Sequence, residues 1–337
     1  MTKIHRAKDT SHAGLRMTDD RAISRRDVVK LGLGAGAALA LGRATAIAGN
    51  VAPPRETEAA ELITRAIPST GERLPVIGMG TAVIYENPTD DQLPPLRDTL
   101  RAFTSLGGRV LDSSPSYGRA ESVAGDLIAE LGTRERFFVA TKAYVRGTED
   151  RSACAARMRQ SLDRFKSDHV DLMQIWNVSN PTLIAPLLDE WKAAKRIRYT
   201  GITSSFKGQY DGLEAAMHAH QFDFVQIDLA IDNRSAQDRI IPLAADRGMA
   251  VLINGPFGRN RVFAKTKGKP LPAWAKDFDA TSWAQFALKY IVSNPQVTAA
   301  IPGVGTVQYL TDDMSAARGR LPNAAMRKRM EAYIDAL

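Results

Sequence analysis

Short apolar runs alternate with longer amphipathic segments along most of this chain, from Leu74 onward. Each apolar run has the length of a strand, and each following segment carries apolar residues at helical spacing. Eight units of this kind follow one another, with strand-like runs at residues 75–81, 109–114, 137–143, 170–176, 198–205, 222–229, 249–255 and 298–303. The pattern predicts eight strand–helix units.

The apolar runs are continuous rather than alternating with polar residues. Strands of this kind are buried on both faces, as in a parallel sheet covered by helices. Eight such units predict an α/β fold of the (β/α)8 TIM-barrel type, with an open doubly wound sheet as the alternative. In a barrel, the chemistry sits where the strands end, at their C-terminal edge.

The first 48 residues have a different character and predict an export signal. Arg25 and Arg26 follow a serine and precede an apolar stretch at 31–41, and Ala46-Ile47-Ala48 is a small-residue cleavage pattern. A charged region, a short apolar region and a small-residue site are typical of a secretory signal. The arginine pair resembles a twin-arginine signal, which serves the export of folded proteins. An ordinary secretory signal and an uncleaved anchor are the alternatives.

The sequence therefore predicts three parts: a twin-arginine signal peptide at 1–48, a linker at 49–70 and the barrel at 71–337. The expected partner is the twin-arginine export machinery and the expected location is the periplasm. The apolar stretch is too short to span a membrane comfortably, so no stable anchor is expected after cleavage.

Charge and cysteine content narrow the function. The net charge is +8, but residues 1–48 hold nine Lys/Arg and four Asp/Glu, which leaves 36 basic against 33 acidic residues, or +3, for the rest. No dense basic stripe with aromatic residues follows, so nucleic-acid binding is not expected. The single cysteine, Cys154, cannot form an internal disulfide. No Cys or carboxylate motif accompanies the histidines, so no metal site is expected.

Three residues at predicted strand ends form an acid–base set. Asp112 ends the second apolar run, Lys142 lies at the end of the third, and Tyr117 follows Asp112 on a loop rich in Ser and Pro. A lysine beside a tyrosine stabilises the tyrosinate and so favours proton transfer, and a carboxylate holds the lysine charged and oriented. Trp176 ends the fourth run, at the same edge of the barrel.

Five motifs occur in a fixed order on the predicted barrel: SPSYGRAE shortly after Asp112, then FVATKA, VDLMQI, GITSS and IPG. From Leu74 to the C-terminus the chain resembles the aldo-keto reductase superfamily, which reduces carbonyl compounds with a nicotinamide cofactor, usually NADPH. The resemblance implies that Tyr117 is the proton donor, with Lys142 and Asp112 as its tuning partners, and that the substrate is a small-molecule carbonyl compound. It also implies a set of cofactor-binding residues, namely Gly80 and Thr81 beside the nicotinamide, Thr203, Ser204 and Gln226 at its carboxamide, Leu229 at the position of the ring-stacking residue, Pro256, Phe257, Gly258 and Arg259 over the pyrophosphate, and Gly303, Asp312 and Asp313 after the last strand.

The chain departs from the family pattern at three places. Trp176 occupies the position of the family's active-site histidine; an indole only donates a hydrogen bond and cannot relay a proton. Leu229 stands where the family usually has a tyrosine that stacks on the nicotinamide. Asp312 and Asp313 would repel a 2′-phosphate, which Arg259 and Arg261 could offset, so NADP(H) is expected over NAD(H).

Three hypotheses follow from these features: a reductase with an altered active site, a barrel that binds a nicotinamide or other ligand without turnover as a sensor or accessory protein, and a barrel with other chemistry and no nicotinamide. The acid–base set favours the first hypothesis, whereas Trp176 and Leu229 favour the second.

Replacing Arg25 and Arg26 together by lysine is expected to leave the protein in the cytoplasm, because the arginine pair is the feature that the export receptor reads. Cell fractionation and immunoblotting of both compartments measure this. Normal periplasmic amounts of the double variant would exclude twin-arginine dependence.

Overall fold

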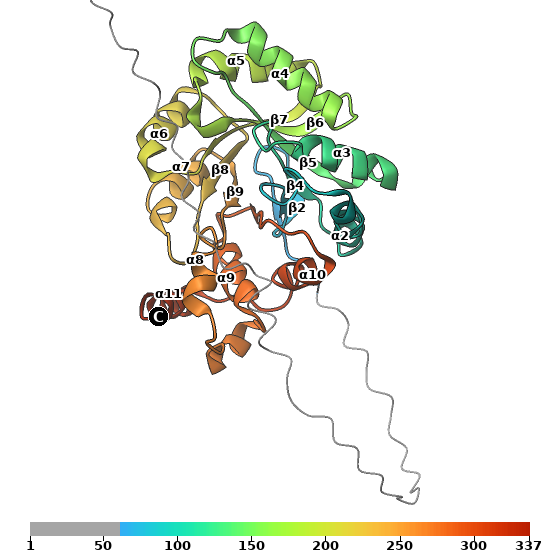
Figure 1. The fold of residues 1–337 in the computed structure, drawn as a ribbon. Helices are drawn as coiled ribbons and strands as arrows, with labels where there is room; N and C mark the ends of the chain where they lie inside the picture. Colours follow the sequence, from blue (N-terminus) through green and yellow to red (C-terminus); the bar gives the residue numbers. More distant parts are fainter. Residues whose placement is uncertain (1–60) are drawn as a thin grey trace, which may run out of the picture. The chain divides into compact units, whose positions relative to one another are not determined.

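A computed structural model describes residues 61–337, and at its centre is a sheet of eight parallel strands (Figure 1). The order in the sheet is β10-β9-β8-β7-β6-β5-β4-β3, so each strand pairs with its neighbour in the chain. Parallel bridges from Ile77 to Ala300 and from Gly80 to Gly303 bring the two ends of the sheet together. The strands are β3 (Met79–Gly80), β4 (Val110–Asp112), β5 (Phe138–Ala143), β6 (Val170–Ile175), β7 (Ile197–Ser204), β8 (Phe224–Asp228), β9 (Ala250–Asn254) and β10 (Ala299–Ala300). The predicted (β/α)8 barrel is confirmed, and the open-sheet alternative is wrong.

Helices follow the strands and cover the outside of the barrel (Figure 1). Several begin at polar residues whose side chains accept a hydrogen bond from the first turn, such as Asp150, Ser282 and Asn323. The helices are α2 (Leu93–Ser105), α3 (Ala120–Leu131), α4 (Arg151–Arg164), α5 (Pro181–Ala193), α6 (Tyr210–Ala219), α7 (Ile240–Asp246), α8 (Arg261–Thr266), α9 (Trp283–Val292), α10 (Val307–Ser315) and α11 (Ala324–Asp335).

The inside of the barrel is apolar at one end and polar at the other. Phe138, Tyr199 and Phe224 meet at the apolar end, with ring centroids 5.5 to 5.8 Å apart. Because side chains alternate between the two faces of a strand, the residues that follow on the same inner face are two positions further along. In β5 the inner face runs from Phe138 to Lys142, and in β8 it runs from Phe224 to Gln226. The polar layer therefore lies toward the C-terminal ends of the strands.

A hairpin closes the apolar end and corrects one predicted boundary. β1 (Thr64–Ala66) pairs antiparallel with β2 (Arg73–Pro75), and Ile67 and Leu74 belong to the apolar cluster inside the barrel. Residues 61–70 of the predicted linker 49–70 are thus part of the barrel unit. The sequence TRA of β1 is too short and polar to predict a strand. The predicted signal at 1–48 and residues 49–60 lie outside the described residues.

A charged network attaches this hairpin to the strands. Glu72 accepts hydrogen bonds from Arg109 at 3.0 Å and from Tyr199 at 2.8 Å, and it also pairs with Arg198. Burial acts to raise the pKa of Glu72, but the hydrogen bonds from Tyr199 and Arg198 outweigh it and hold the pKa below its usual value. A lowered pKa means that this stabilisation is present at neutral pH and is lost as the pH falls through the pKa of the folded state.

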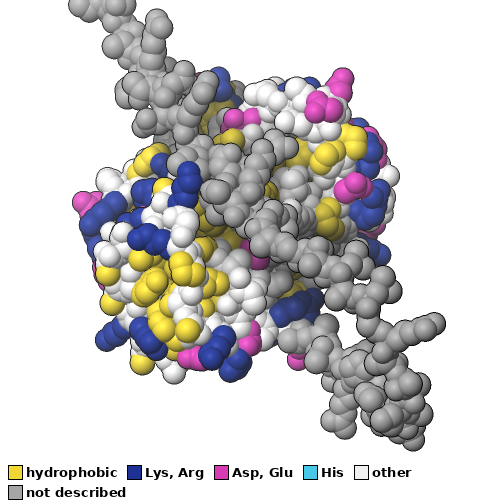
Figure 2. Space-filling view, turned by 60° about the horizontal axis from the view of Figure 1, so that its bottom comes forward, with side chains coloured by type: hydrophobic (Ala, Val, Ile, Leu, Met, Phe, Trp, Pro, Cys, Tyr) yellow, Lys and Arg dark blue, Asp and Glu magenta, His cyan; other side chains and the backbone are white. Residues whose placement is uncertain are grey.

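On the face shown in Figure 2, Lys and Arg side chains are interspersed with Asp and Glu and with apolar residues. Between residues 61 and 337, no helix is both long and apolar enough to cross a membrane. Cys154 is free and fully buried, and burial raises the pKa of its thiol to about 11.

Candidate active site

A buried ion pair lies at the polar end of the barrel interior. The Lys142 ammonium on β5 is 2.7 Å from a carboxylate oxygen of Asp112 on β4 and 2.7 Å from the Ser113 carbonyl oxygen. Lys142 is 2% exposed and Asp112 is 3% exposed. Burial acts to lower the pKa of Lys142, but the charge of Asp112, its hydrogen bond and the nearby Tyr117 and Glu121 together outweigh burial, so the pKa is raised. Lys142 therefore remains protonated at neutral pH.

The second oxygen of the Asp112 carboxylate accepts from two side-chain amides. Gln174 Nε2 on β6 lies 3.2 Å away and Gln226 Nε2 on β8 lies 2.8 Å away. Asp112 is thus held by donors from three other strands, one of them on the opposite side of the barrel. Hydrogen bonds to the ionised form of a carboxyl group favour that form and fix its orientation.

Tyr117 lies next to this pair. The Lys142 ammonium is 5.2 Å from the centroid of the Tyr117 ring, and Tyr117 is partly exposed. The loop that carries it is braced by a hydrogen bond from the Tyr117 amide to the Ser114 carbonyl, at 3.0 Å. Gly118 adopts φ +49°, and a Cβ there would lie 2.8 Å from the Glu86 carbonyl oxygen. The structure brings Asp112, Tyr117 and Lys142 together; their catalytic role stays a prediction.

Trp176 stands at the end of β6 on a strained turn. Its ring centroid is 5.4 Å from that of Tyr144, which is almost fully buried. Asn177, Val178 and Asn180 all have positive φ values, of 46°, 58° and 43°, a region that a β-branched residue such as Val178 rarely adopts. The backbone N–H of Asn177 donates a hydrogen bond to Thr203 Oγ1 at 3.1 Å, and this bond holds the turn in place. The indole therefore has a defined orientation at the barrel mouth.

The residues predicted to hold a nicotinamide carboxamide are already bonded within the chain. Thr203 accepts from Asn177, Ser204 donates to Gln209 Oε1 at 2.9 Å, and Gln226 donates to Asp112. Two amide oxygens of the described residues, Gln174 Oε1 and Asn177 Oδ1, are buried without a hydrogen-bond partner. A buried acceptor without a hydrogen-bond partner lowers the stability of the folded protein. The N–H groups of a carboxamide would supply the missing hydrogen bonds. Sequence reasoning missed Gln174, although its place two residues before Trp176 sets it on the same inner face.

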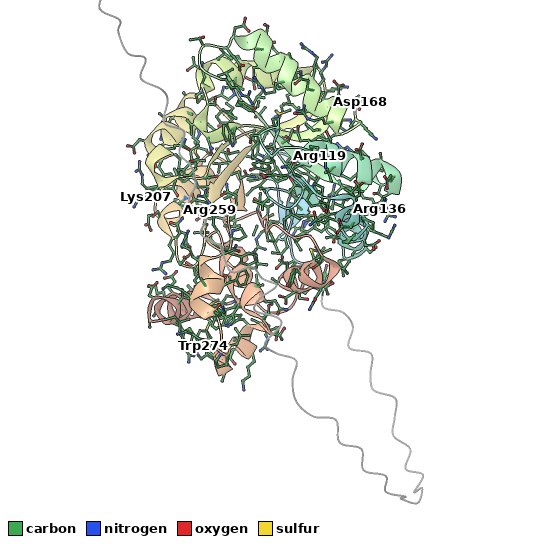
Figure 3. All side chains as sticks on the ribbon, viewed as in Figure 1. Arg119, Arg136, Asp168, Lys207, Arg259 and Trp274 are labelled. Carbon is green, nitrogen blue, oxygen red and sulfur yellow. The ribbon has the colours of Figure 1, made fainter. Side chains whose placement is uncertain are left out.

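The loop after β9, which is predicted to close over a pyrophosphate, turns through three consecutive left-handed residues. Gly258, Arg259 and Asn260 have consecutive positive φ values of 59°, 52° and 73°. Pro256, Phe257 and Gly258 are buried, whereas Arg259 is exposed, with its guanidinium 5.2 Å from the Phe206 ring centroid. Lys207, which directly follows Phe206 in the chain, is labelled with Arg259 in Figure 3. Backbone amides in such turns, together with cations, suit a phosphate group.

Of the remaining residues that are predicted to bind the cofactor, some are exposed to solvent and others are buried. Gly80 bridges to exposed Gly303, and a Cβ on Gly80 would lie 3.0 Å from the Ile301 carbonyl oxygen, so the close approach favours glycine. Asp312 accepts from Ser282 and Gln285, each at 2.8 Å. Thr81, Leu229 and Asp313 are fully buried, so their side chains are not open to solvent in this arrangement. The predicted contacts of these residues with a cofactor stay predictions.

Two surface hollows lie away from this site. These hollows, of about 770 and 510 Å³, lie along α4 and α5 and contain none of the predicted site residues. Among residues 61–337 no cluster of His, Cys, Asp or Glu side chains is arranged to hold a metal ion. The chemistry of the barrel mouth, rather than the size of a hollow, locates the candidate site.

The comparisons with known proteins agree with this geometry. Residues 76–334 match the model of the Aldo/keto reductase family. The chain is 26% identical to the aldo-keto reductase YhdN of Bacillus subtilis over 59% of this chain and 63% of that protein, and 24% identical to the methylglyoxal reductase YeaE of Escherichia coli over 77% and 91%. Thus the chain spans slightly less than two thirds of the length of the Bacillus relative.

Solved structures show the same fold. An aldo-keto reductase from Klebsiella pneumoniae in complex with NADPH aligns with a TM-score of 0.67 and 19% identity, over 81% of this chain and 96% of that one. The holo form of the reductase AKR11C1 from Bacillus halodurans aligns with a TM-score of 0.66 and 17% identity, over 81% and 96%. This chain belongs to the aldo/keto reductase family.

Asp112→Asn is expected to lower the free energy of unfolding by about 3–5 kcal/mol, because it leaves the Lys142 charge buried without a counter-charge. Adding Lys142→Met should recover part of the loss, since the buried charge is then gone. Urea unfolding of the wild type and both variants measures this. A double variant less stable than Asp112→Asn alone would contradict the interpretation.

Proposed function

We propose that this protein reduces a small-molecule carbonyl compound to an alcohol with NADP(H). The observation that carries the proposal is the arrangement of Tyr117 beside Lys142, which is itself held by Asp112. A phenol is a weak acid near neutral pH, and a fixed ammonium beside it stabilises the phenolate that proton donation leaves behind. The arrangement suits a general acid for a carbonyl oxygen.

The residues divide the work as follows. Tyr117 donates its hydroxyl proton to the oxygen of the substrate carbonyl, and Lys142 stabilises the resulting tyrosinate. Asp112, held by Gln174 and Gln226, keeps Lys142 charged and in position. A bound nicotinamide supplies the hydride. Fixed charges of this kind act strongly because the barrel interior excludes water.

Trp176 gives this site a different character from the family pattern. Its indole N–H can orient a carbonyl oxygen but cannot exchange protons, so Tyr117 is the proton donor without help from a histidine. The indole is also larger than an imidazole and narrows the space beside Tyr117. We expect slow turnover of simple aldehydes and a preference for substrates that fit against an aromatic wall.

NADP(H) is the proposed cofactor. Arg259 is exposed at the phosphate-binding loop, and Arg261 is paired with Asp232 at 2.8 Å, so Arg259 is the cation of the two with room for a phosphate. Asp312, which could have repelled a 2′-phosphate, is bonded to Ser282 and Gln285. The Klebsiella relative in complex with NADPH supports the same choice.

We propose a periplasmic location, reached through the twin-arginine machinery. The arginine pair at Arg25 and Arg26 supports this proposal. Export of a folded protein lets the cofactor be loaded in the cytoplasm, where it is made, before the protein crosses the membrane.

A second function remains open, in which the barrel binds a nicotinamide without turnover and acts as a sensor or accessory protein. Two departures favour it: Trp176 replaces the family's histidine, and Leu229 offers no aromatic ring to the nicotinamide and is fully buried. Turnover measurements on the following variants distinguish the two functions.

Tyr117→Phe keeps the ring and removes the acidic proton, so carbonyl turnover should fall at least ~100-fold while cofactor affinity stays nearly unchanged. The measurements are kcat/KM with an aldehyde and the Kd of NADPH from tryptophan fluorescence. Tyr333→Phe, on α11, is the control and should behave like the wild type. Wild-type rates in Tyr117→Phe would show that the proposed proton donor is wrong.

Trp176→His restores a small donor and opens space beside Tyr117. A well-placed donor to a developing oxyanion gives up to roughly a hundredfold in rate, so kcat/KM for small aldehydes should rise by no more than this. The lost volume is expected to cost ~1–3 kcal/mol of stability. An intact variant that binds NADPH but gains no activity would favour the non-catalytic function, and absence of NADPH binding in the wild type would exclude both functions.

A further inference from the structure

We propose that the site takes carbonyl compounds that also carry an anionic group, and that Arg146 recognises the anion. The proposal rests on the reductase function and names its substrate class. Beyond the C-terminal ends of β5 and β6, the rings of Tyr144 and Trp176 are in contact. Arg146 and Arg157 lie against the Tyr144 ring.

The register of β5 and β6 places this cluster directly above the ion pair. Lys142 pairs with Gln174, and Ala143 pairs with Ile175. Lys142 and Gln174 point into the barrel, where they bond Asp112, whereas Ala143 and Ile175 pack in the outer core. The next residues, Tyr144 and Trp176, lie just beyond the C-terminal ends of these two strands. Their ring contact at 5.4 Å agrees with this placement.

Two guanidinium groups hold Tyr144, and a single carboxylate accompanies them. Arg157 on α4 stacks on the Tyr144 ring at 4.5 Å and forms an ion pair with Glu149 at 2.9 Å. The Arg146 guanidinium donates to the Tyr144 hydroxyl at 2.9 Å and is exposed, and only its backbone amide bonds Glu149. Within the residues that the structure describes, no carboxylate forms an ion pair with Arg146. The exposed Arg146 guanidinium thus adds a positive charge to the rim beside Trp176, which the nearby Glu149 carboxylate partly offsets.

The distance between Lys142 and Arg146 limits the length of a ligand that can reach both residues. Lys142 and Arg146 are four residues apart, so their backbones are at most ~13 Å apart. A carbonyl carbon near Tyr117 and an anion at Arg146 would be separated by an apolar or aromatic segment lying against Trp176. A guanidinium binds a carboxylate through two parallel hydrogen bonds, which makes a carboxylate-bearing aromatic aldehyde a suitable probe.

The test compares two aldehydes that differ in charge: 4-carboxybenzaldehyde and its methyl ester. Wild type should prefer the acid by roughly three- to tenfold in kcat/KM, through a lower KM, because partly exposed ion pairs contribute modestly. Arg146→Gln should remove the preference and Arg146→Glu should reverse it. Raising the salt concentration should weaken the wild-type preference.

Arg136→Gln is the matched control. Arg136 is exposed on η2 (Arg134–Arg136), just before β5, and so lies at the other end of the same strand (Figure 3). The substitution removes the same charge from the protein and should keep the preference for the acid. A preference that persists in Arg146→Gln, or that falls equally in Arg136→Gln, would overturn the proposal.

A binding measurement separates this proposal from the reductase function. Titration calorimetry with benzoate, in the presence of NADP⁺, should show at least roughly threefold weaker binding to Arg146→Gln than to the wild type. If the wild type reduces neither aldehyde, the proposed reductase function is wrong. The benzoate titration still decides whether Arg146 binds an anion. Equal benzoate affinity in both proteins would overturn the anion site.

Discussion

The site depends on the placement of one ammonium group inside a barrel that is otherwise largely apolar. The Lys142 charge is tolerated there because Asp112 lies 2.7 Å away, and an isolated charge in such surroundings would be strongly disfavoured. Asp112 in turn is held by amides from β6 and β8, so that β4, β5, β6 and β8 share one polar contact network. The same contacts that make the charge acceptable also set where Tyr117 meets it.

The barrel interior has two layers: an apolar layer that stabilises the fold and a polar layer that forms the candidate site. Phe138, Tyr199 and Phe224 fill the lower interior, and the hairpin of β1 and β2 covers it. One step higher, the inner positions become polar and form the site. Some of the positive-φ residues lie at the upper edge, in the turn at Asn177 and Val178 and in the loop of residues 258–260. Strained turns persist only where their surroundings hold them, and here they carry the residues that we expect to face a ligand.

The mouth is where we expect this chain to differ from its family. An indole in place of an imidazole removes a proton relay but adds a flat apolar surface, supported by Tyr144 and two guanidinium groups. We expect this exchange to shift the site from general carbonyl reduction toward recognition of a particular substrate. The proposed acid–base residues Asp112, Tyr117 and Lys142 lie together below it, so we expect the change to act on selectivity and rate rather than on the type of reaction.

The sequence by itself determined the barrel, because eight apolar runs at regular spacing leave few other arrangements, and it determined Asp112, Tyr117, Lys142 and Trp176 as residues at or just beyond strand ends. Only the tertiary structure decided which polar groups meet. Gln226 donates to Asp112, a residue 114 positions away in the chain. The role of Gln174 and the hairpin strand β1 also escaped prediction. Each depends on contacts between distant segments, and local periodicity carries no information about such contacts.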